Sequence, residues 1–547
     1  MKHYLTHFEE TIKDRWNQAS LTNYEADSYT YGEVATHMAK FHLFFEDIKL
    51  EKGDKIALYA KNTARWGISF FAINTFEAVV VPILIDFLPE NAAGLVDHSD
   101  SKVLFTDTDA WEKMDIALMP QIQAVISVTD FTLLYAATDE IKAAMDNLHL
   151  TFQAKYPMGF TRDNVKYPTN NDKNLAIINY TSGTTSAPKG VMVRYESVSS
   201  NVDYALNKLP VEKGDTQVSM LPMAHMYGLM FELIYPFCGG STITYLGKTP
   251  TPAVLLGAMA DVKPTLVVTV PLVMEKIFKG KLLPVLNKPV MKVLTNIPGI
   301  NTIIFKKIKT QLLTAFGGRA RAIVMGGAAL NPTVEKWFKK FKLPYTVGYG
   351  MTEMAPLLAY ESWDEFAPKS CGRIVTNMEV RINSDDPQRE VGEIQTKGVN
   401  VMSGYFKNEE ATKAAFTEDG WMRTGDLGVI DAKGNIFIKG RSKNMLLSSN
   451  GQNIYPEEIE AMLNNQDYVV ESVVVQRAHK LVGLVYLDAA KIKVDKLDGE
   501  DISDKMVDMK NLVNKDLPNY SKLAQIEVVE EPFAKTPKMS IKRFMYK

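Results

Sequence analysis

The chain is poor in the residues that mark several protein classes. Its 547 residues include only two cysteines, Cys238 and Cys371, which lie far apart and lack the close spacing of metal ligands. A disulfide framework is therefore not expected, whereas free thiols in a reducing compartment are. The formal net charge is only −2, from 62 basic and 64 acidic side chains. Without a strong cationic excess, nucleic acid is not expected as the main partner.

Long hydrophobic runs are also missing. The most apolar stretch, residues 68–88, is interrupted by Asn74, Glu77, Pro82 and Asp86. This pattern is typical of a buried helix followed by a strand and not of a bilayer span. The first ten residues have no apolar core and carry acids early, so we expect no signal peptide. We expect a cytoplasmic protein, with peripheral attachment to the inner membrane face left open.

The overall composition is that of an ordinary globular protein, with 46% hydrophobic and 23% charged residues. A chain of this length is too long for one compact core, so two or more domains are expected. Short apolar runs alternate with helical patterns over the first four-fifths of the chain. This rhythm predicts an α/β fold with mainly parallel sheets. The clearest predicted strands are residues 78–84, 102–106, 266–270 and 322–325.

The C-terminal part has a different pattern. Residues 435–440 predict a strand that ends in glycine, and a helix is expected to begin near Pro456, with Glu457 and Glu458 in its first turn. Two β-rich runs follow, at residues 472–475 and 481–486. We therefore predict a large N-terminal domain of several subdomains, residues 1–441, and a small mobile α+β domain, residues 442–547.

One segment departs from the balanced charge of the whole chain. Between residues 276 and 321 every ionised side chain is basic, and apolar residues fill the spaces between them. Such a patch can contact an anionic membrane surface or collect an acidic ligand. The plainer interpretation, which we prefer on the sequence alone, is a solvated helical face with extended lysines. The basic residues are Lys276, Lys279, Lys281, Lys288, Lys292, Lys306, Lys307, Lys309, Arg319 and Arg321.

A loop of small and polar residues is the most informative feature. Residues 180–190 read YTSGTTSAPKG and follow an apolar run, residues 175–180, that predicts a strand. Glycines let backbone N–H groups turn toward one point, hydroxyls add neutral donors and Lys189 adds positive charge, so the loop suits a polyphosphate. It differs from the phosphate loop of GTPases, because Pro188 and Gly190 replace that motif's second glycine and its Ser/Thr. The alternative is a Ser/Thr-rich surface turn.

Five further motifs follow this loop in order. They are residues 325–330 (MGGAAL), 348–353 (GYGMTE), 421–428 (WMRTGDLG), 440–443 (GRSK) and 451–460 (GQNIYPEEIE). From about Tyr29 to the C-terminus, the chain resembles the adenylate-forming (AMP-binding) superfamily of acyl-CoA synthetases, peptide-synthetase adenylation domains and firefly luciferase. The resemblance implies that a carboxylate attacks the α-phosphate of ATP, pyrophosphate leaves, and a thiol then displaces AMP from the acyl-adenylate. Two anions must meet, so such a site needs positive charge and alignment.

The resemblance also implies roles for single residues. Glu353 would bind Mg²⁺, with Thr184 near the same ion, because carboxylate and phosphate oxygens serve this hard cation. Lys189 and the loop from Ser182 onward would hold the β- and γ-phosphates, and Thr352 would meet the α-phosphate. Tyr349 would face adenine, opposite Gly327 and Ala328, and Asp426 would accept hydrogen bonds from the ribose with help from Arg441. The implied nucleotide-binding set is Thr181, Ser182, Gly183, Thr184, Thr185, Lys189, Gly327, Ala328, Tyr349, Gly350, Thr352, Asp426 and Arg441.

Two positions depart from the family pattern. Ser186 replaces the usual third glycine of the loop, which we expect to need only mild adjustment. The family's C-terminal catalytic lysine is displaced: if Thr536 is the anchor, Ser540 stands in its place. We assign the role to Lys538, with Lys535 and Lys542 as the alternatives. By resemblance, Lys443 is the hinge residue about which the small domain rotates, and Gly451 approaches the pantetheine arm of the thiol.

The acid substrate is indicated by residues 221–228, which resemble the fatty-acyl branch of the superfamily. Amino-acid-activating relatives carry an Asp there for the substrate's ammonium group, whereas this chain has His225, so an amino acid would bury an unpaired charge. His225 is interpreted as a gating residue, the alternative being a hydrogen-bonded core histidine. Gly350 stands where short-chain relatives carry a tryptophan, which implies an open tunnel for medium or long acyl chains.

The predicted function is an ATP-dependent, magnesium-requiring ligase that joins a fatty acid to coenzyme A and releases AMP and pyrophosphate. Its catalytic residues would be Thr184, Lys189, Glu353 and Lys538. Two alternatives stay open. An acyl-carrier protein can be the acceptor in place of coenzyme A, or the chain can be a non-catalytic protein that binds a nucleotide or an acyl-adenylate.

Overall fold

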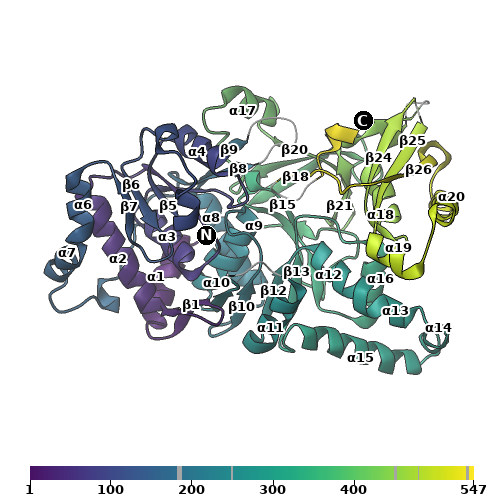
Figure 1. The fold of residues 1–547 in the computed structure, drawn as a ribbon, viewed down its shortest axis with the longest axis horizontal. Coiled ribbons are helices and arrows are strands. Elements are labelled where there is room, and N and C mark those ends of the chain that lie inside the picture. Colours follow the sequence, from purple (N-terminus) through teal and green to yellow (C-terminus); the bar gives the residue numbers. More distant parts are fainter. Residues whose placement is uncertain (182–187, 248–250, 449–451, 479, 537–540, 547) are drawn as a thin grey trace.

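The computed structural model describes residues 1–546 except 182–187, 248–250, 449–451, 479 and 537–540. Several layers of sheet and helix form a large N-terminal part, and the smaller C-terminal part, coloured from yellow-green to yellow, lies at one corner of it (Figure 1). Among the described residues of the N-terminal part, strand pairing is mainly parallel in three sheets and antiparallel in two others. The predicted fold class, a large α/β part with a small α+β part, is confirmed.

A seven-stranded sheet carries the predicted phosphate loop. Its order is β7-β6-β5-β3-β4-β8-β9, with five parallel inner strands and an antiparallel strand at each edge. Every residue of β4 and β6 is buried, as in parallel strands that are covered on both faces. The strands are β3 Lys55–Tyr59, β4 Val79–Pro82, β5 Ser101–Thr106, β6 Ala124–Ser127, β7 Leu133–Ala136, β8 Leu175–Thr181 and β9 Lys189–Arg194.

Most of the apolar stretch at residues 68–88 lies inside the protein, although Asp86 and Leu88 at its end are exposed. Helix α3 (Ala64–Thr75) begins at Thr63, whose side chain accepts a hydrogen bond from the Trp66 N–H, and nearly all its residues are buried. Strand β4 follows it, so the predicted helix and strand are confirmed. Within the described ranges, no helix is both long and apolar enough to cross a bilayer.

Two other sheets are mainly parallel. In the first, of order β10-β11-β1-β2, only β2 is antiparallel; the second has the order β12-β13-β14. The predicted strands 266–270 and 322–325 are β12 and β13, which pair with each other. The strands are β1 Ala19–Asn23, β2 Ser28–Thr30, β10 Thr216–Ser219, β11 Thr242–Tyr245, β12 Leu266–Thr269, β13 Ala322–Met325 and β14 Tyr345–Val347.

Antiparallel strands complete the N-terminal part. They form a three-stranded sheet, β15-β16-β17, and a four-stranded sheet, β18-β19-β20-β21. The bounds are β15 Tyr349–Gly350, β16 Leu357–Tyr360, β17 Arg373–Ile374, β18 Met378–Asn383, β19 Gly392–Gly398, β20 Met422–Ile430 and β21 Ile436–Arg441.

The C-terminal part is a three-stranded mixed sheet with helices. Strand β24 (Val469–Arg477) is antiparallel to β25 (Lys480–Leu487), which is parallel to β26 (Leu523–Val529). The helix expected near Pro456 is α18 (Pro456–Leu463), and its residues Ile459 and Leu463 enter the core. Two more helices are α19 Ala489–Asp495 and α20 Gly499–Lys515. The division at residues 441 and 442 stays a prediction, as does the mobility of the domain.

The two cysteines are free, as expected. Cys238 is fully buried and Cys371 is partly buried. Burial raises the pKa of the Cys371 thiol to about 12. Both thiols are therefore poor nucleophiles in this structure.

Candidate functional site

The phosphate loop connects the last two strands of the seven-stranded sheet. Thr181 and Lys189 are paired across β8 and β9, at the end of the ladder, and the Thr181 hydroxyl lies 3.4 Å from the Lys189 carbonyl oxygen. The pairing brings Thr181 and Lys189, which flank the loop, together at the edge of the sheet. Ser182, Gly183, Thr184 and Thr185 lie outside the described residues.

A tyrosine connects the loop lysine with the predicted magnesium ligand. The Lys189 Nζ lies 5.1 Å from the ring centroid of Tyr405, and the Tyr405 hydroxyl donates a hydrogen bond to Glu353 Oε1 at 2.9 Å. Glu353 is buried. Burial of the Tyr405 phenol, together with the negative charge of Glu353 beside it, raises the pKa of the phenol far above its ordinary value. The arrangement places a cation, a hydroxyl and a carboxylate in one row.

Backbone pairing fixes this row. The Phe406 N–H donates to the Gly190 carbonyl at 2.7 Å, and the Met402 N–H donates to the Glu353 carbonyl at 2.8 Å. The segment around Tyr405 therefore lies between β9 and the turn that carries Glu353. Tyr405 was not predicted from the sequence, where its only signal is a Gly-Tyr pair outside the recognised motifs.

The predicted adenine-facing residues follow neighbouring parallel strands. Gly327 and Ala328 come shortly after β13, and Tyr349 comes shortly after β14. The two strands are parallel to each other, with Met325 opposite Val347. The Gly348 N–H donates to the Met325 carbonyl at 2.8 Å and joins the two turns. Carboxyl ends of adjacent parallel strands are a common ligand site in α/β sheets. The structure thus brings these three residues to one edge.

Asp426 is held by two of its predicted neighbours. The Tyr349 hydroxyl donates to Asp426 Oδ2 at 2.6 Å, and Arg441 Nε lies 2.7 Å from Oδ1. Burial raises the pKa of the Asp426 carboxyl, although the guanidinium beside it acts in the opposite direction. Both oxygens keep lone pairs for further donors such as ribose hydroxyls.

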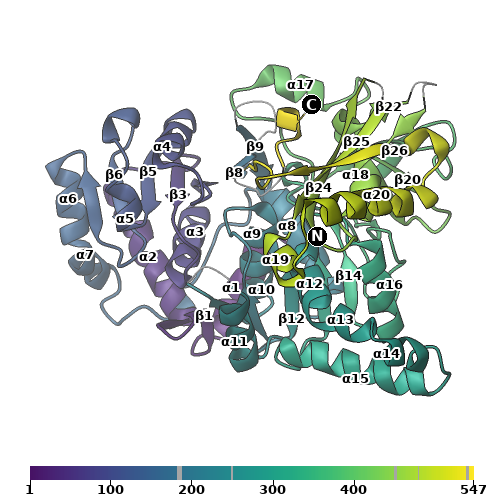
Figure 2. The same cartoon turned by 45° about the vertical axis from the view of Figure 1, so that its right-hand side comes forward.

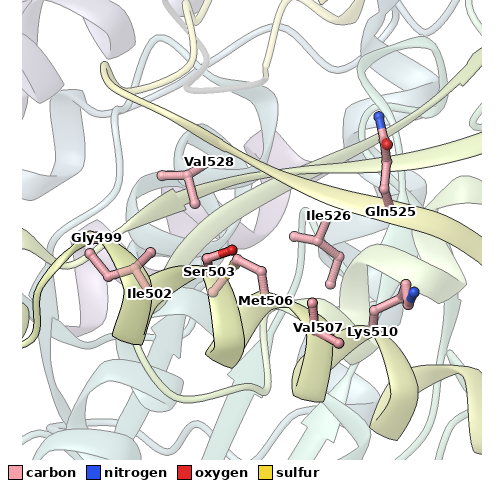
Figure 3. A pocket seen from close by; sticks show the side chains of 9 residues that line it. All are labelled: Gly499, Ile502, Ser503, Met506, Val507, Lys510, Gln525, Ile526 and Val528. Carbon is pink, nitrogen blue, oxygen red and sulfur yellow. The ribbon is translucent and has the colours of Figure 1, made fainter.

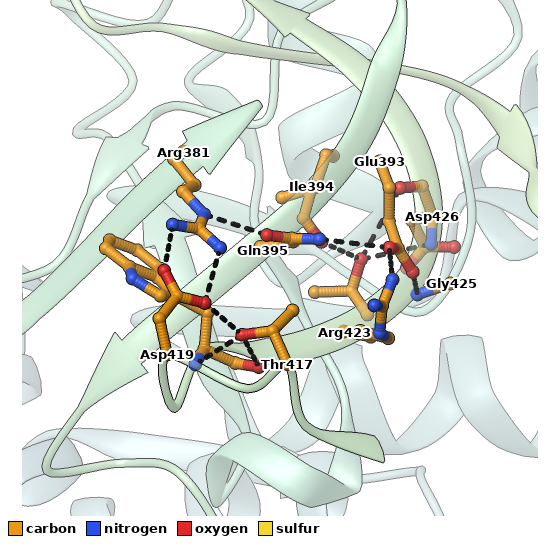
Figure 4. Close-up of polar contacts among 11 residues, drawn as sticks. Arg381, Glu393, Ile394, Gln395, Thr417, Asp419, Arg423, Gly425 and Asp426 are labelled. Carbon is orange, nitrogen blue, oxygen red and sulfur yellow. Dashed lines mark hydrogen bonds and ion pairs between the residues drawn. The ribbon is translucent and has the colours of Figure 1, made fainter. Parts of the chain in front are cut away.

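A polar network on the four-stranded sheet supports the turn before Asp426 (Figure 4). Arg381 binds Asp419 with two hydrogen bonds, of 2.6 and 3.0 Å, and donates to Gln395 at 2.8 Å. Gln395 in turn donates to Glu393 at 3.2 Å, and Glu393 accepts from the Gly425 N–H at 3.3 Å. This chain of contacts fixes the backbone one residue before the buried carboxylate.

The predicted acyl-site segment is anchored at three points. Asn179 of β8 donates to the Ala224 carbonyl at 2.8 Å, and Asn62 donates to the Leu221 carbonyl at 2.7 Å. Half-buried His225 follows directly and precedes helix α9 (Met226–Leu229). Because Asn179 lies two residues before Thr181, the segment and the phosphate loop are tied to the same strand.

The third anchor is Glu232, which is fully buried in a π-helical turn, Met230–Ile234. Its carboxyl accepts hydrogen bonds from the Ser219 hydroxyl at 3.0 Å and from the Met220 and Leu221 N–H groups at 3.1 and 2.8 Å. Burial raises the pKa of Glu232 to about 8, against the opposing effect of these donors. Glu232 was not predicted from the sequence, because one Glu in an apolar helical pattern gives no signal.

Gly350 has a packing reason for being glycine. A Cβ atom built on it would collide with the backbone carbonyl of Pro356. The close approach of the two chain segments therefore requires glycine whatever the ligand, and its predicted effect on an acyl tunnel stays a prediction. Thr352 lies one residue before Glu353, in the short 3₁₀ turn Thr352–Met354, and is partly exposed.

The three candidate C-terminal lysines have different environments. Lys535 forms an ion pair with Glu471 in the C-terminal part, and the Lys542 N–H donates to the Ala534 carbonyl at 2.8 Å. Lys538 and Gly451 lie outside the described residues. The predicted hinge residue, Lys443, lies in the short turn Ser442–Asn444 that follows β21.

A surface cavity of about 360 Å³ lies elsewhere, between α20 and β26 (Figure 3). Side chains such as Met506 and Ile526 point into it, with Lys510 and Gln525 at one end. None of its lining residues belongs to the predicted site. We do not assign it to the nucleotide or acyl site.

Comparison with protein families covers both parts of the chain. Residues 8–406 match the family described as AMP-binding enzyme, and residues 443–546 match the AMP-binding enzyme C-terminal domain. The curated Mycobacterium bovis protein named long-chain-fatty-acid–CoA ligase FadD15 is 28% identical over 482 residues, which cover 84% of this chain and 77% of that protein. Long-chain-fatty-acid–CoA ligase 1 of Saccharomyces cerevisiae is also 28% identical, over 87% of this chain and 74% of its own.

Solved structures show the same fold. ATP-bound MatB from Rhodopseudomonas palustris superposes with a TM-score of 0.76 at 20% identity, covering 100% of this chain and 98% of its own. O-succinylbenzoate coenzyme A synthetase (MenE) from Bacillus subtilis, with ATP and magnesium ion, gives a TM-score of 0.73 at 20% identity over 100% and 99% of the two chains. The family match extends over most of the sequence. The chain therefore belongs to the AMP-binding, adenylate-forming enzyme superfamily.

Proposed function

We propose that this protein is an ATP-dependent ligase that activates a medium- or long-chain fatty acid as its acyl-adenylate and transfers the acyl group to coenzyme A. AMP and pyrophosphate would be the other products. The observation that carries the proposal is the row formed by Lys189, Tyr405 and Glu353 beside the phosphate loop. In this row the Lys189 ammonium can bind phosphate oxygens, and the oriented Glu353 carboxylate can bind Mg²⁺. A magnesium-bound polyphosphate requires both groups.

The residues present fit ATP and magnesium. Glu353 is a buried carboxylate with one oxygen fixed by Tyr405, which leaves its other oxygen for a hard cation. Magnesium commonly takes one or two carboxylates together with substrate phosphates, and when bound it would neutralise phosphate charge. Lys189 would attract the same phosphates, while Asp426, held by Tyr349 and Arg441, would accept from the ribose hydroxyls.

Positioning is the main task of such a site, because both reactants are anions. Asn179 connects the strand before the phosphate loop with the segment that carries His225. We infer that this link sets the distance between the nucleotide phosphates and the acid. Holding two reactants in near-attack geometry contributes roughly 7–11 kcal/mol to catalysis in favourable cases. His225 is proposed to line the acyl entrance.

The choice of a fatty acid rests on two supports. The relatives at 28% identity are named long-chain-fatty-acid–CoA ligases. The acyl-site segment holds His225 and no Asp or Glu between residues 221 and 228, so an ammonium-bearing acid would lack a partner there. Lys538 is proposed to serve the adenylation step. The turn at Lys443 is proposed to be the hinge for the domain rotation that follows adenylation.

The decisive experiment supplies ATP, Mg²⁺ and fatty acids of graded chain length and measures pyrophosphate, AMP and thioester. Pyrophosphate release that depends on the acid, followed by coenzyme A thioester, is the expected result. Thioester formed only with an acyl-carrier protein would identify the alternative acceptor. Nucleotide binding without pyrophosphate from any acid would overturn the proposal in favour of a binding protein. A Glu353→Gln variant is the negative control, because it removes the proposed magnesium ligand and keeps the side-chain shape.

A further inference from the structure

Exposed apolar side chains gather at one end of the molecule. Helix α14 (Pro289–Leu294) and the start of helix α15 (Ile300–Ala315) form a projecting corner in both views (Figures 1 and 2). Val290, Val293 and Ile303 are 68%, 63% and 71% exposed. We define the apolar corner as Val285, Val290, Val293, Ile297, Ile300 and Ile303, all of which are exposed.

These side chains are not needed by the protein's own core. The opposite face of α15 is packed, with the Phe305 ring centroid 5.6 Å from that of Phe341 and 6.3 Å from that of Trp337. Ile308 and Leu312 of the same helix are buried. The helix therefore has a complete inner face, and the apolar corner is additional apolar surface. A cluster of this kind marks an interaction site in a folded protein.

Positive charge surrounds the apolar corner. Residues 276–321 contain ten of the chain's 62 basic residues and none of its 64 acidic ones. Two of the ten serve the fold: Lys279 donates to the Asn464 carbonyl at 2.6 Å, and Arg321 pairs with Asp215. Six others are exposed and make no ion pair within the described part of the chain. Four of these six belong to α14 and α15 or directly precede α14: Lys288, Lys292, Lys306 and Lys307.

We propose that the apolar corner and its four exposed lysines dock peripherally on an anionic lipid surface. Valine and isoleucine side chains would enter the boundary between headgroups and acyl chains, and the lysines would reach the lipid phosphates. A second copy of the chain fits less well, because a two-fold contact would place the same lysines against one another. The solvated helical face preferred from the sequence would have its apolar residues covered by lysine stems, whereas Val290, Val293 and Ile303 are exposed. This exposure is why we propose docking in its place.

The inference does not depend on the ligase activity, because none of the residues of the apolar corner belongs to the implied nucleotide-binding set. Each exposed lysine near an anionic membrane is expected to strengthen binding roughly fivefold at moderate salt. Insertion of the apolar corner is expected to contribute a further attraction that salt does not weaken.

The test measures co-sedimentation of the full chain with phosphatidylcholine vesicles that contain or lack phosphatidylglycerol. The protein should bind the anionic vesicles more tightly, and high salt should weaken this binding. Lys292→Gln/Lys307→Gln should weaken it at least roughly tenfold, by loss of two lysines. Val293→Glu/Ile303→Glu should reduce it to background, because carboxylates oppose both the apolar and the ionic contact. Matched controls are Lys433→Gln and Val494→Glu, which change an exposed lysine and a 78% exposed valine elsewhere.

Circular dichroism and thermal unfolding of each variant would check the fold. If Val293→Glu/Ile303→Glu is misfolded, vesicle binding by Lys292→Gln/Lys307→Gln tests the proposal. This variant should fold, since both lysine side chains are exposed and outside the core. Equal binding to both vesicle types, or unchanged binding by a folded lysine variant, would overturn the proposal. So would a lipid-free dimer that Val293→Glu/Ile303→Glu converts to monomer, because a second copy would then be the occupant.

Discussion

The Tyr405 hydroxyl donates a hydrogen bond to Glu353 Oε1 at 2.9 Å, across 52 residues of sequence. The same ring faces the Lys189 ammonium, 5.1 Å from its centroid. Tyr405 thus positions both the cation and the carboxylate that the proposed reaction needs. Its effect can be separated into a hydroxyl contribution and a ring contribution.

Tyr405→Phe removes the hydroxyl and keeps the ring. We expect acid-dependent pyrophosphate exchange to fall roughly tenfold, because a hydrogen bond to a charged group is worth about 1.5–3 kcal/mol and its loss frees the carboxylate. The magnesium concentration for half-maximal exchange should rise. Tyr405→Ala should cost more, because the contact with Lys189 is also lost. Tyr345→Phe is the control: its hydroxyl lies 3.3 Å from Glu335, outside the site. Equal effects of the two phenylalanine variants would refute a specific role for Tyr405.

Asp426→Asn should weaken nucleotide binding. The variant removes the charge that pairs with Arg441 at 2.7 Å and forces Tyr349 to reorient its hydroxyl. Loss of a buried charge partner and a ribose acceptor together should lower ATP affinity roughly ten- to a hundredfold, measured by calorimetric titration. Asp431→Asn is matched to it, because Asp431 also accepts hydrogen bonds in a turn of the same sheet but outside the site. Unchanged affinity in Asp426→Asn would argue against the ribose assignment.

Glu232 should make stability depend on pH. Burial raises its pKa from 4.5 to about 8, so between these values the folded chain holds a proton that the unfolded chain has released. This stabilisation is complete below the unfolded pKa and is lost as the pH rises through the folded pKa. The free energy of unfolding should therefore fall with rising pH by up to about 1.4 kcal/mol per pH unit from this group.

Glu232→Gln should flatten that slope, as measured by denaturant unfolding at a series of pH values. The glutamine side chain cannot ionise, so it removes this pH dependence. Its amide NH₂ group cannot accept the hydrogen bonds that the Met220 and Leu221 N–H groups donate to the carboxyl, so the variant will be less stable at acid pH. Glu410→Gln, at an exposed position in helix α17 (Glu409–Ala415), should leave the slope as in the unchanged chain. A parallel pH profile of Glu232→Gln and the unchanged protein would contradict the raised pKa.

Lys538→Ala should reduce adenylation roughly a hundred- to a thousandfold, the usual effect of losing an oriented donor. Lys535→Ala should have little effect on adenylation, because the Lys535 ammonium is paired with Glu471. Thioester formation from a supplied acyl-adenylate should be retained in Lys538→Ala, since that step does not need a lysine at the α-phosphate. A large loss in Lys535→Ala or Lys542→Ala and none in Lys538→Ala would reassign the residue.

The local elements could be predicted because their signals are contiguous. Buried parallel strands are apolar throughout, so β4, β5, β12 and β13 were readable as short runs bounded by polar residues. The phosphate loop, with Lys189 and the strand before it, was readable for the same reason. Gly350 shows the limit: its close approach to the Pro356 backbone, which requires glycine, has no signal in the neighbouring residues. The open acyl tunnel that its position implies stays a prediction.

The sequence by itself determined the fold class, the family and the short motifs, because each depends on neighbouring residues in the chain. Only the tertiary structure decided the role of Tyr405, the anchoring by Glu232 and the pairing of Tyr349 with Asp426, which lie 77 residues apart. It also decided which lysines of the basic segment are exposed and which are used by the fold. The physical reason is that contact distance, burial and charge pairing depend on how distant segments pack, and no local pattern records that.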